Sequence, residues 1–363
     1  MTLLLLAPIN AVLTTIRRTA FVPQSVLHIS YMGHVPHETV RILRANGVNA
    51  DYLAVGHSAI WNSADFQIES ARLPFVAAIR EFKLFWSVVA RYEIVHSHFM
   101  VTMSRSGWEW PLLKRMGRKL VIHYRGCEIR DRERNMALHP DVNICQDCDY
   151  RPYVCQDELT VKRRQLSSRY GDAFLVTTPD LNDFAPTATH VKFFRPESVE
   201  PVPPRLPGSP IRIVHATNHP GIDGTSHIQR AVESLKAKGL AVELRILNGV
   251  SQRDVLKSLE DADLSIGKMK MGYYANAQVE SLAAGVPVVT YVRPDLRTPD
   301  LEDSGLILTS LEDLERTLEV YVRDPVKLAG KRALAQAGAR RLHDNAAISQ
   351  QLARLYAGLS APR

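Results

Sequence analysis

All four cysteines of this 363-residue chain lie within one stretch of 29 residues, as Cys127, Cys145, Cys148 and Cys155. A chain of this length does not need disulfides, and cysteines with unrelated roles would be scattered, so we expect reduced thiols that share a site. Cys145 and Cys148 have the Cys-x2-Cys spacing that chelates a metal through two thiolates, and the other two would complete a tetrahedral set for Zn²⁺. The pattern therefore predicts a structural zinc ion; free or redox-active thiols and an iron–sulfur cluster are the alternatives. Four thiolates leave no open coordination position, so no catalytic metal is expected.

A second candidate site lies between Ala262 and Val292. A strand ends there in a loop that contains Gly272, a helix begins near Asn276, and a second strand follows. The N–H groups and the positive dipole end at the start of such a helix suit a diphosphate. Glu280 lies about one turn inside the helix, where its carboxylate can accept hydrogen bonds from the 2′- and 3′-hydroxyls of a ribose. Taken alone, Glu280 would be a solvated helix residue.

Two lysines stand at the end of the strand that leads into this loop, at positions 268 and 270. Phosphate groups need cationic or N–H partners. We therefore expect Lys268 and Lys270, which share one face, to bind the diphosphate together with the backbone at Gly272. Two solvated loop lysines are the alternative.

Two further candidates lie in the first half: Gly33 follows the first predicted strand, and His123 lies at the end of the fourth. Gly33 would let the backbone approach a ligand closely; the alternative is a glycine that is needed only for the turn after the strand. The imidazole of His123, at a strand end on the cleft side, can hydrogen-bond a hydroxyl; a core histidine with satisfied hydrogen bonds is the alternative. His98 is the weaker candidate of the two histidines.

These positions belong to a repeated pattern of apolar run, small-residue turn and helical stretch, which is typical of parallel βαβ units. The first half predicts strands over Val26–Tyr31, Asp51–Val55, Ile94–Phe99, Leu120–Tyr124 and Ala173–Thr178, with helices over Pro36–Asn46 and Leu73–Arg91. The second half predicts strands over Ile211–Ala216, Val242–Leu247, Leu264–Lys268, Pro287–Val292 and Gly305–Leu308, with helices over Thr225–Lys238, Gln252–Leu259 and Asn276–Ala284.

Two segments of the first half need separate comment. Phe75, Ile79, Phe82 and Trp86 recur three or four residues apart. We interpret this stripe as core packing, with membrane contact as the alternative. The loop over Arg130–Asp157 has no helix or strand pattern, and the zinc site would hold it in place.

Six of the fifteen residues from Pro196 to Pro210 are proline. Proline lacks a backbone donor and has a restricted φ, so this stretch is predicted to connect two domains. We expect one Rossmann-like domain over residues 1–195, the connector over 196–210, a second Rossmann-like domain over 211–340 and a C-terminal helix over 341–363. The domains are expected to be doubly wound and to face each other across a cleft, with ligands at the carboxyl ends of the strands.

Composition excludes several classes of protein. With 45% apolar and 23% charged residues the chain is neither disordered nor collagenous. Its net charge of +7 is uneven: residues 114–134 hold eight basic and three acidic residues, a local +5. This indicates an anionic ligand or surface, or else a solvated basic face. Nucleic-acid binding is not expected, because the sequence has no basic motif interleaved with aromatic residues.

The apolar N-terminal stretch is too short to span a bilayer. Arg17 and Arg18 follow the apolar run, whereas a signal peptide has its basic residues before it. A cytoplasmic location is therefore expected.

Several strings of the sequence resemble one known family. Residues 279–289, Val-Glu-Ser-Leu-Ala-Ala-Gly-Val-Pro-Val-Val, resemble the Glu-x-Met-Ala-x-Gly-x-Pro-Val-Val signature of retaining nucleotide-sugar glycosyltransferases of the GT-B fold, family four. Similar strings are Ile94–His98, Val121–Asp131, Val176–Leu181 and Ile213–Asn218 with Gly224 and Thr225. Each string is short, and their order and spacing along both halves carry the resemblance.

The resemblance implies roles for several residues. Glu280 would bind the donor ribose, His123 the donor sugar, and the Gly33 loop would lie beside the donor phosphate and the acceptor. Asn218 would begin the first loop of the donor-binding domain. Two positions depart from the family: Gly272 stands where the first glutamate of its Glu-x7-Glu motif would be, and Asp223 stands where a phosphate-binding lysine is usual.

The activity implied is transfer of a sugar from a UDP-, GDP- or ADP-linked donor to an acceptor hydroxyl, with retention of configuration. The basic segment of the first, acceptor-side domain suggests a glycan or lipid-linked acceptor of the cell envelope or a polysaccharide, with peripheral contact at the inner membrane face. A GT-B-like sugar-nucleotide epimerase and a non-catalytic nucleotide-sugar-binding protein are the alternatives.

Overall fold

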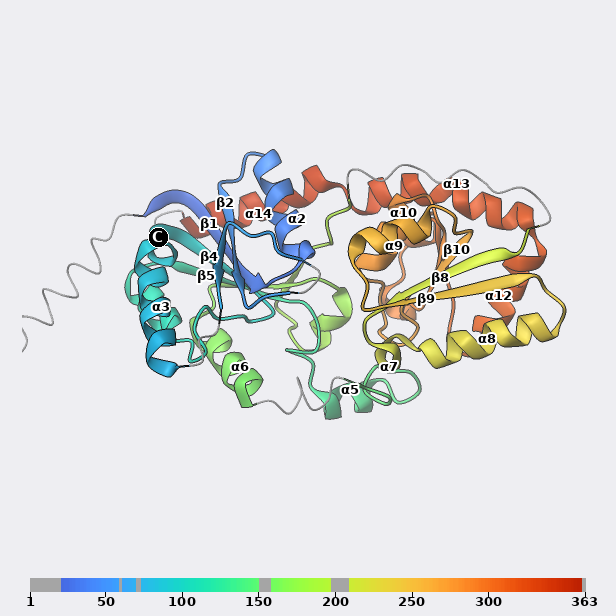
Figure 1. The fold of residues 1–363 in the computed structure, drawn as a ribbon, viewed down its shortest axis with the longest axis horizontal. Helices are drawn as coiled ribbons and strands as arrows, with labels where there is room; N and C mark the ends of the chain where they lie inside the picture. The colour runs from blue at the N-terminus through green and yellow to red at the C-terminus, as the bar shows by residue number, and fades with distance from the viewer. Residues whose placement is uncertain (1–20, 59–60, 70–72, 150–157, 197–208, 361–363) are drawn as a thin grey trace, which may run out of the picture.

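The computed structural model describes residues 21–58, 61–69, 73–149, 158–196 and 209–360. Two parallel β-sheets, one from each half of the chain, lie side by side with helices packed against them (Figure 1). The predicted α/β class with two doubly wound units is therefore confirmed.

The first sheet has seven strands in the order β3-β2-β1-β4-β5-β6-β7, all parallel. They are β1 (Val22–Tyr31), β2 (Ala50–Val55), β3 (Phe66–Ile68), β4 (Tyr92–His98), β5 (Lys119–Tyr124), β6 (Ala173–Val176) and β7 (Thr189–His190). The strand order reverses between β1 and β4. In an open parallel sheet, the crevice at such a reversal is the usual place for a ligand.

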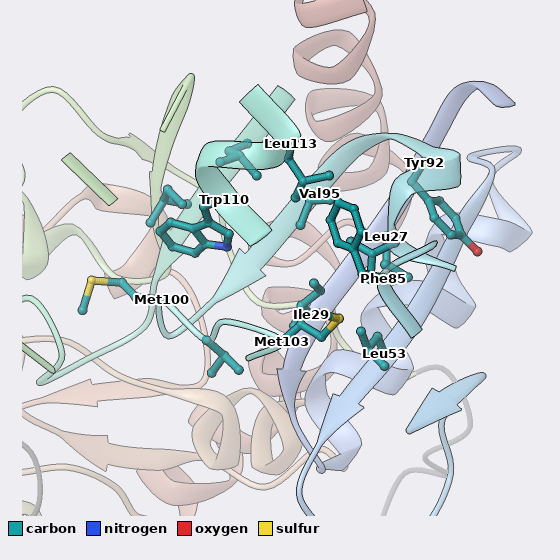
Figure 2. Packing of buried hydrophobic residues seen from close by; sticks show 14 of the residues in the cluster. Leu27, Ile29, Leu53, Phe85, Tyr92, Val95, Met100, Met103, Trp110 and Leu113 are labelled. Atoms are coloured by element: carbon teal, nitrogen blue, oxygen red, sulfur yellow. The ribbon is translucent and has the colours of Figure 1, made fainter. Parts of the chain in front are cut away.

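One face of this sheet packs against α3 (Pro74–Ser87) and α4 (Glu109–Arg115). Leu27 of β1, Phe85 of α3 and Trp110 of α4 are fully buried in this cluster (Figure 2). Apolar residues at alternate positions of adjacent parallel strands point to the same face, so burial there removes a continuous surface from water.

The other face is covered by α2 (His34–Ala45) and α14 (Asn345–Ser360). Val26 of β1 packs there with Leu352 and Tyr356 of α14. The remaining helices of this half are η1 (Val89–Arg91), α5 (Arg132–Leu138), α6 (Glu158–Tyr170) and η2 (Pro179–Asp183). The C-terminal helix α14 therefore packs into the core of the N-terminal half of the chain (Figure 1).

The second sheet has five parallel strands in the order β12-β11-β10-β8-β9. They are β8 (Ile211–Thr217), β9 (Val242–Asn248), β10 (Leu264–Ile266), β11 (Val288–Thr290) and β12 (Leu306–Leu308). The helices are α7 (Pro220–Asp223), α8 (Thr225–Ala237), α9 (Gln252–Leu259), α10 (Asn276–Ala283), η3 (Pro294–Leu296), α11 (Pro299–Glu302), α12 (Leu314–Arg323) and α13 (Pro325–Leu342).

The turn between α13 and α14 joins the two halves through hydrogen bonds. Nδ1 of His343 lies 2.8 Å from the carbonyl oxygen of Phe193, and its Nε2 lies 2.9 Å from the hydroxyl of Tyr274. The Asn345 side chain bonds both the N–H and the carbonyl of Arg195, each at 2.9 Å. The predicted C-terminal helix thus begins after a hydrogen-bonded turn and returns to the first sheet.

All ten predicted strands are present, with ends displaced by a few residues. The short edge strands β3 and β7 were not predicted, because they have too few residues to show a period. Helix α5 was not predicted either, and it lies in the loop that we expected to be irregular. Most of the proline-rich connector, residues 197–208, lies outside the described residues.

The interpretation of the aromatic stripe on α3 as core packing is wrong for Phe75, Ile79 and Phe82 and holds only for Trp86. Phe75 and Phe82 are 74% and 58% exposed, and Ile79 is also exposed. Phe85, which is not part of the stripe, supplies the buried face of the helix, with Trp86 partly buried beside it. In the part of the chain that the structure describes, no helix combines the length and apolarity needed to cross a bilayer.

Candidate functional site

A cavity lies between the two sheets, at the carboxyl ends of their strands. The lining includes His34, Glu38, His123, Arg125, Thr177, Lys192 and Arg195 from the first half, Gln252, Asn276 and Glu280 from the second, and Leu352 of α14. Three of these residues, Glu280, Asn276 and His123, are predicted site residues.

Glu280 faces this cavity from α10, with 3% of its surface exposed. Its Oε1 accepts hydrogen bonds from the side-chain amides of Gln252, at 2.7 Å, and Asn276, at 2.6 Å. Nε2 of His34 lies 3.3 Å from the same oxygen. The carboxylate is therefore placed to accept hydrogen bonds from neutral donors, as a ribose-binding carboxylate must.

The N-termini of two helices meet at the cavity. His34 is the first residue of α2 and Asn276 is the first residue of α10, and their side chains lie 3.5 Å apart. At α10, the side-chain oxygen of Gln278 accepts the N–H of Ala275 at 2.8 Å, which stabilises the start of the helix. Two positive helix ends, with Arg125, Lys192 and Arg195 in the lining, make the cavity suitable for an anion.

Gly33 lies at the N-cap of α2 in an extended conformation, with φ −178°. Its N–H donates to the hydroxyl of Tyr52 at 3.2 Å, and that hydroxyl donates to the carbonyl of Tyr31 at 2.6 Å. Gly33 therefore adjoins the cavity through His34, although it is not among the lining residues.

His123 lies at the end of β5 and is nearly fully buried. Nδ1 lies 3.1 Å from Nε2 of His96, and Nε2 lies 3.2 Å from the hydroxyl of Thr177. Burial, and after it the Arg125 charge, holds the pKa of His123 well below its usual range. The ring is therefore neutral at pH 7, and a ligand must replace the Thr177 contact to reach its Nε2.

Neither predicted phosphate-binding lysine lines the cavity. Lys268 forms an ion pair with the buried Asp223, which also accepts the Thr217 hydroxyl at 2.7 Å. Nζ of Lys270 lies 2.6 Å from Asp147, and the Lys270 side chain is only 2% exposed. Each lysine therefore already has a carboxylate partner: Asp223, at the position where the resembling family usually has a lysine, pairs with Lys268, and Asp147 of the cysteine loop pairs with Lys270.

The other predicted positions lie near this ion-pair region. Gly272 has φ +92°, a conformation that favours glycine, and a Cβ there would lie 3.1 Å from the side chain of Arg293. Asn218 is exposed directly after β8. The structure thus separates the predicted donor-binding residues into a cavity group and a group beside the cysteine loop.

The cysteine loop reaches across to the second half. Oδ2 of Asp149 accepts the N–H of Gly221 at 3.4 Å, and a Cβ at Gly221 would lie 2.0 Å from the carbonyl oxygen of Asp147. Ile222 of α7 packs against Ile144 and Cys145. Glycine at position 221 is therefore required for the close approach of the two segments.

Three of the four cysteines share this cluster. Cys145 is buried, and Cys127 and Cys148 are partly buried against it. The Asn135 amide lies 3.3 Å from Sγ of Cys145, and the Arg130 guanidinium lies 3.6 Å from Sγ of Cys127. Such donors suit thiolate sulfur. In the part of the chain that the structure describes, however, the three cysteines do not bring their sulfurs within 4.8 Å of one another as a ligand group. The fourth predicted ligand, Cys155, lies outside the described residues.

Several basic side chains of segment 114–134 form ion pairs or hydrogen bonds within the protein. Lys114 pairs with Asp172 at 2.6 Å, Arg130 pairs with Asp180 at 2.5 Å, and the buried Arg118 donates to the carbonyl of Ala90. These side chains hold the first sheet and its loops together. The local excess of positive charge in the sequence is therefore not a cationic surface of the same size.

Several residues that line the cavity were not predicted from the sequence. His34 directly follows Gly33, and Gln252 follows Ser251, whose hydroxyl accepts the N–H of Asp254 at 3.2 Å as the N-cap of α9. The N-cap signal of Ser251 is visible in the sequence. Lys192 and Arg195 had no such signal, because they belong to an irregular segment after β7.

Two parallel-stranded α/β units with a cavity between them at the strand ends define the GT-B fold of glycosyltransferases. Solved structures share it over most of the chain. Sucrose-phosphate synthase from Thermosynechococcus elongatus superposes with a TM-score of 0.64 at 12% identity, covering 93% of this chain and 99% of that one. HepE from Anabaena, in complex with UDP and glucose, gives 0.62 at 13% identity, with 93% and 100% covered.

The catalytic domain of starch synthase IV from Arabidopsis thaliana, bound to ADP and acarbose, gives a TM-score of 0.61 at 8% identity and covers 94% and 100%. No protein-family model matches the sequence. No curated protein matches it either. At these identities, the similarity establishes the fold.

Proposed function

We propose that this protein is a glycosyltransferase that moves a sugar from a nucleotide diphosphate donor to an acceptor hydroxyl. The observation that most supports this proposal is the position of Glu280, a buried carboxylate at a cavity where the N-termini of α2 and α10 meet. A ribose diol and a diphosphate need these two groups side by side. The UDP and ADP in the titles of the HepE and starch synthase structures support a nucleotide in the same fold.

In this proposal Glu280 exchanges the amides of Gln252 and Asn276 for the ribose hydroxyls. The diphosphate lies against the two helix ends, with Arg125, Lys192 and Arg195 near it. These positive groups stabilise the charge that develops on the departing diphosphate. His123 hydrogen-bonds the transferred sugar.

The finer assignment follows the sequence resemblance: a family-four-like enzyme that retains configuration and uses a UDP-, GDP- or ADP-linked donor. The acceptor is a glycan or a lipid-linked sugar. Gly272 in place of the first family glutamate, together with two lysines that already hold carboxylates, favours a non-catalytic binding protein as the second candidate.

The test is incubation with a panel of nucleotide sugars and acceptors, followed by nucleotide release and product mass. Acceptor-dependent release supports the transferase, a changed sugar without acceptor indicates an epimerase, and donor binding without turnover indicates the binding protein. Glu280→Gln should weaken donor binding strongly, whereas Glu243→Gln, at an exposed position of β9, should not. Lack of response to every donor would overturn the proposal.

We also propose a structural zinc ion bound by Cys127, Cys145, Cys148 and Cys155. Burial of Cys145 and the N–H donors beside two sulfurs support this assignment. Zinc would hold the cysteine loop in the position from which Asp147 reaches Lys270. The ion would thus influence the donor side of the cleft only indirectly, by fixing the loop that carries Asp147 beside Lys270.

We further propose a cytoplasmic protein that touches the inner face of the membrane through α3. Phe75, Ile79 and Phe82 form an exposed apolar face, and Arg80 and Lys83 on the same helix are exposed beside it. Apolar side chains next to basic ones suit an anionic lipid surface. Such a surface would bring a lipid-linked acceptor to the first half of the chain.

A further inference from the structure

Four histidines lie together on one face of the first sheet. His28 of β1 is paired with His96 of β4, and His98 of β4 is paired with His123 of β5. Residues paired across parallel strands point to the same face, as do residues two apart on one strand. All four side chains therefore project toward α14, which contributes Tyr356.

Every ring nitrogen of these histidines has a hydrogen-bond partner. From one end, Nε of Arg125 lies 2.9 Å from Nδ1 of His98, and Nε2 of His98 lies 2.9 Å from Nδ1 of His28. Nε2 of His28 lies 3.5 Å from the hydroxyl of Tyr356, the longest contact of the series.

From the same hydroxyl the series continues. It lies 2.7 Å from Nδ1 of His96, Nε2 of His96 lies 3.1 Å from Nδ1 of His123, and Nε2 of His123 lies 3.2 Å from the hydroxyl of Thr177. That hydroxyl is 3.3 Å from the carbonyl oxygen of Tyr124. A single chain therefore connects Arg125 to the backbone of β5.

The chemistry of the Arg125 end gives this chain one direction. A guanidinium can only donate, so Nδ1 of His98 must accept and its proton must be on Nε2. The same reasoning then applies in turn to His28, Tyr356 and His96. At the far end the Tyr124 carbonyl already accepts the N–H of Thr177 at 3.1 Å, so the Thr177 hydroxyl can turn toward the carbonyl or toward His123, and this end permits the direction without fixing it.

The environment keeps all four rings neutral, as this reasoning requires. Burial lowers the pKa of His28 to about 3 and holds the pKa values of His96 and His98 well below their usual range, as it does that of His123. Burial also raises the pKa of the Tyr356 hydroxyl, which therefore keeps its proton.

We propose that Arg125 fixes the tautomer of His123 through this chain, so that His123 always carries its proton on Nε2, the nitrogen next to Thr177. Arg125, His98, His28, Tyr356 and His96 are then positioning residues. This inference rests on the proposed function for its consequence: at the cavity His123 donates a hydrogen bond to a sugar hydroxyl or phosphate oxygen, and it cannot act as a base.

A metal ion is the main competing explanation for the cluster. Ligand atoms of His28, His96 and His98 lie within 4.8 Å of one another. However, all of their ring nitrogens take part in the chain, and the Arg125 guanidinium beside His98 opposes a cation. A metal held by these histidines would overturn the proposal.

The experiment is long-range ¹⁵N–¹H correlation NMR of the full chain with labelled histidine, at pH 7 and without ligand. In the wild type, His28, His96, His98 and His123 should each be protonated on Nε2 alone. Tyr356→Phe removes the central hydroxyl. His98 and His28 should then keep their tautomer, while His96 and His123 should become mixtures with a large Nδ1–H fraction.

Tyr92→Phe is the matched control. It also removes a buried hydroxyl, one that donates to Asp51 at 2.5 Å and lies outside the chain. It should leave all four tautomers unchanged. Protonation of His123 on Nδ1 in the wild type, an unchanged His123 in Tyr356→Phe, or metal bound to the cluster would each contradict the proposal.

The wild-type measurement needs no variant, so protonation of His123 on Nδ1 would overturn the proposal even if Tyr356→Phe fails to fold. No donor is present in these spectra, so their outcome is independent of sugar transfer. If donor binding fails while the tautomers are as expected, only the proposed function is wrong. If the tautomers differ while transfer occurs, only this inference is wrong.

Discussion

Nε2 of His34 lies 3.3 Å from Oε1 of Glu280, and this contact joins the N-terminus of α2 in the first half to α10 in the second. The two side chains come from different halves of the chain and both line the cavity. A ribose bound by Glu280 would therefore lie beside His34.

We expect His34→Ala to weaken donor binding by about tenfold, the loss of one hydrogen bond to a charged or phosphate group. Because the two residues touch, the effects of His34→Ala and Glu280→Gln should not add. Isothermal titration of the single and double variants measures this coupling. His57→Ala, at an exposed position after β2, is the control. Additive effects would show that the contact has no role in binding.

For the ion pair of Lys270 with Asp147, we predict that substitution of the lysine and substitution of the aspartate change donor affinity in opposite directions. Lys270 lies outside the cavity lining, so it can reach a diphosphate only by leaving Asp147; if it does so, Lys270→Ala should weaken donor binding by about 10-fold or more, the value of a charge-assisted hydrogen bond. Asp147→Asn should strengthen it, because the lysine loses its competing carboxylate. Asp261→Asn, which removes a carboxylate paired with Arg212 away from the cavity, should change nothing. Weaker binding in both variants would mean that the pair acts by holding the halves together.

The buried histidines predict that the protein loses stability as the pH falls below about 6.5. Above that pH they are neutral in both states. Below it the unfolded chain binds protons, while burial keeps the folded-state pKa values of His28 and His343 near 3 and 4. Each such histidine therefore costs about 1.4 kcal/mol of unfolding free energy per pH unit.

Urea unfolding at a series of pH values from 7.5 to about 4.5 measures this slope. His343→Asn should reduce the slope by about one proton, whereas the exposed His57→Ala should not. An unfolding free energy independent of pH in this range would show that the cluster is protonated or open to solvent.

The zinc proposal predicts about one zinc ion per chain in reduced, anaerobically purified protein. Cys148→Ser should lower the zinc content well below one and lower the melting temperature. Met271→Leu, in the same cluster, keeps the thiols and should keep the metal. Elemental analysis with thermal unfolding measures both quantities. Full stability of the wild type without any metal would contradict the proposal.

The exposed face of α3 predicts binding to vesicles that contain anionic lipid. Phe75→Ser with Phe82→Ser should reduce the bound fraction by at least tenfold, since burial of one aromatic side chain contributes about 1.5–3 kcal/mol. Val326→Ser is the control, because Val326 is an 82% exposed apolar residue on the other half. Sedimentation with vesicles measures the fraction. Equal loss in the control would show that the α3 face is not specific.

Regular elements of the chain could be predicted from local patterns. The ten strands and the helix that begins at Asn276 have clear apolar periods and turn residues. Glu280 could be found because its helix start and the following Gly-x-Pro turn are contiguous. The α3 stripe shows the limit of this reasoning, because Phe75 and Phe82 have the correct helical spacing and still face away from the core.

Local patterns thus decided the α/β class, the two-sheet arrangement and the candidacy of Glu280, since each depends on residues within one or two turns of chain. Contacts between distant segments decided the rest. Lys270 meets Asp147 across 123 residues, and His96 meets Tyr356 across 260. Which strands become neighbours, and which helix returns over them, depends on the packing of the whole chain, so the partners of these side chains are not encoded in any short string.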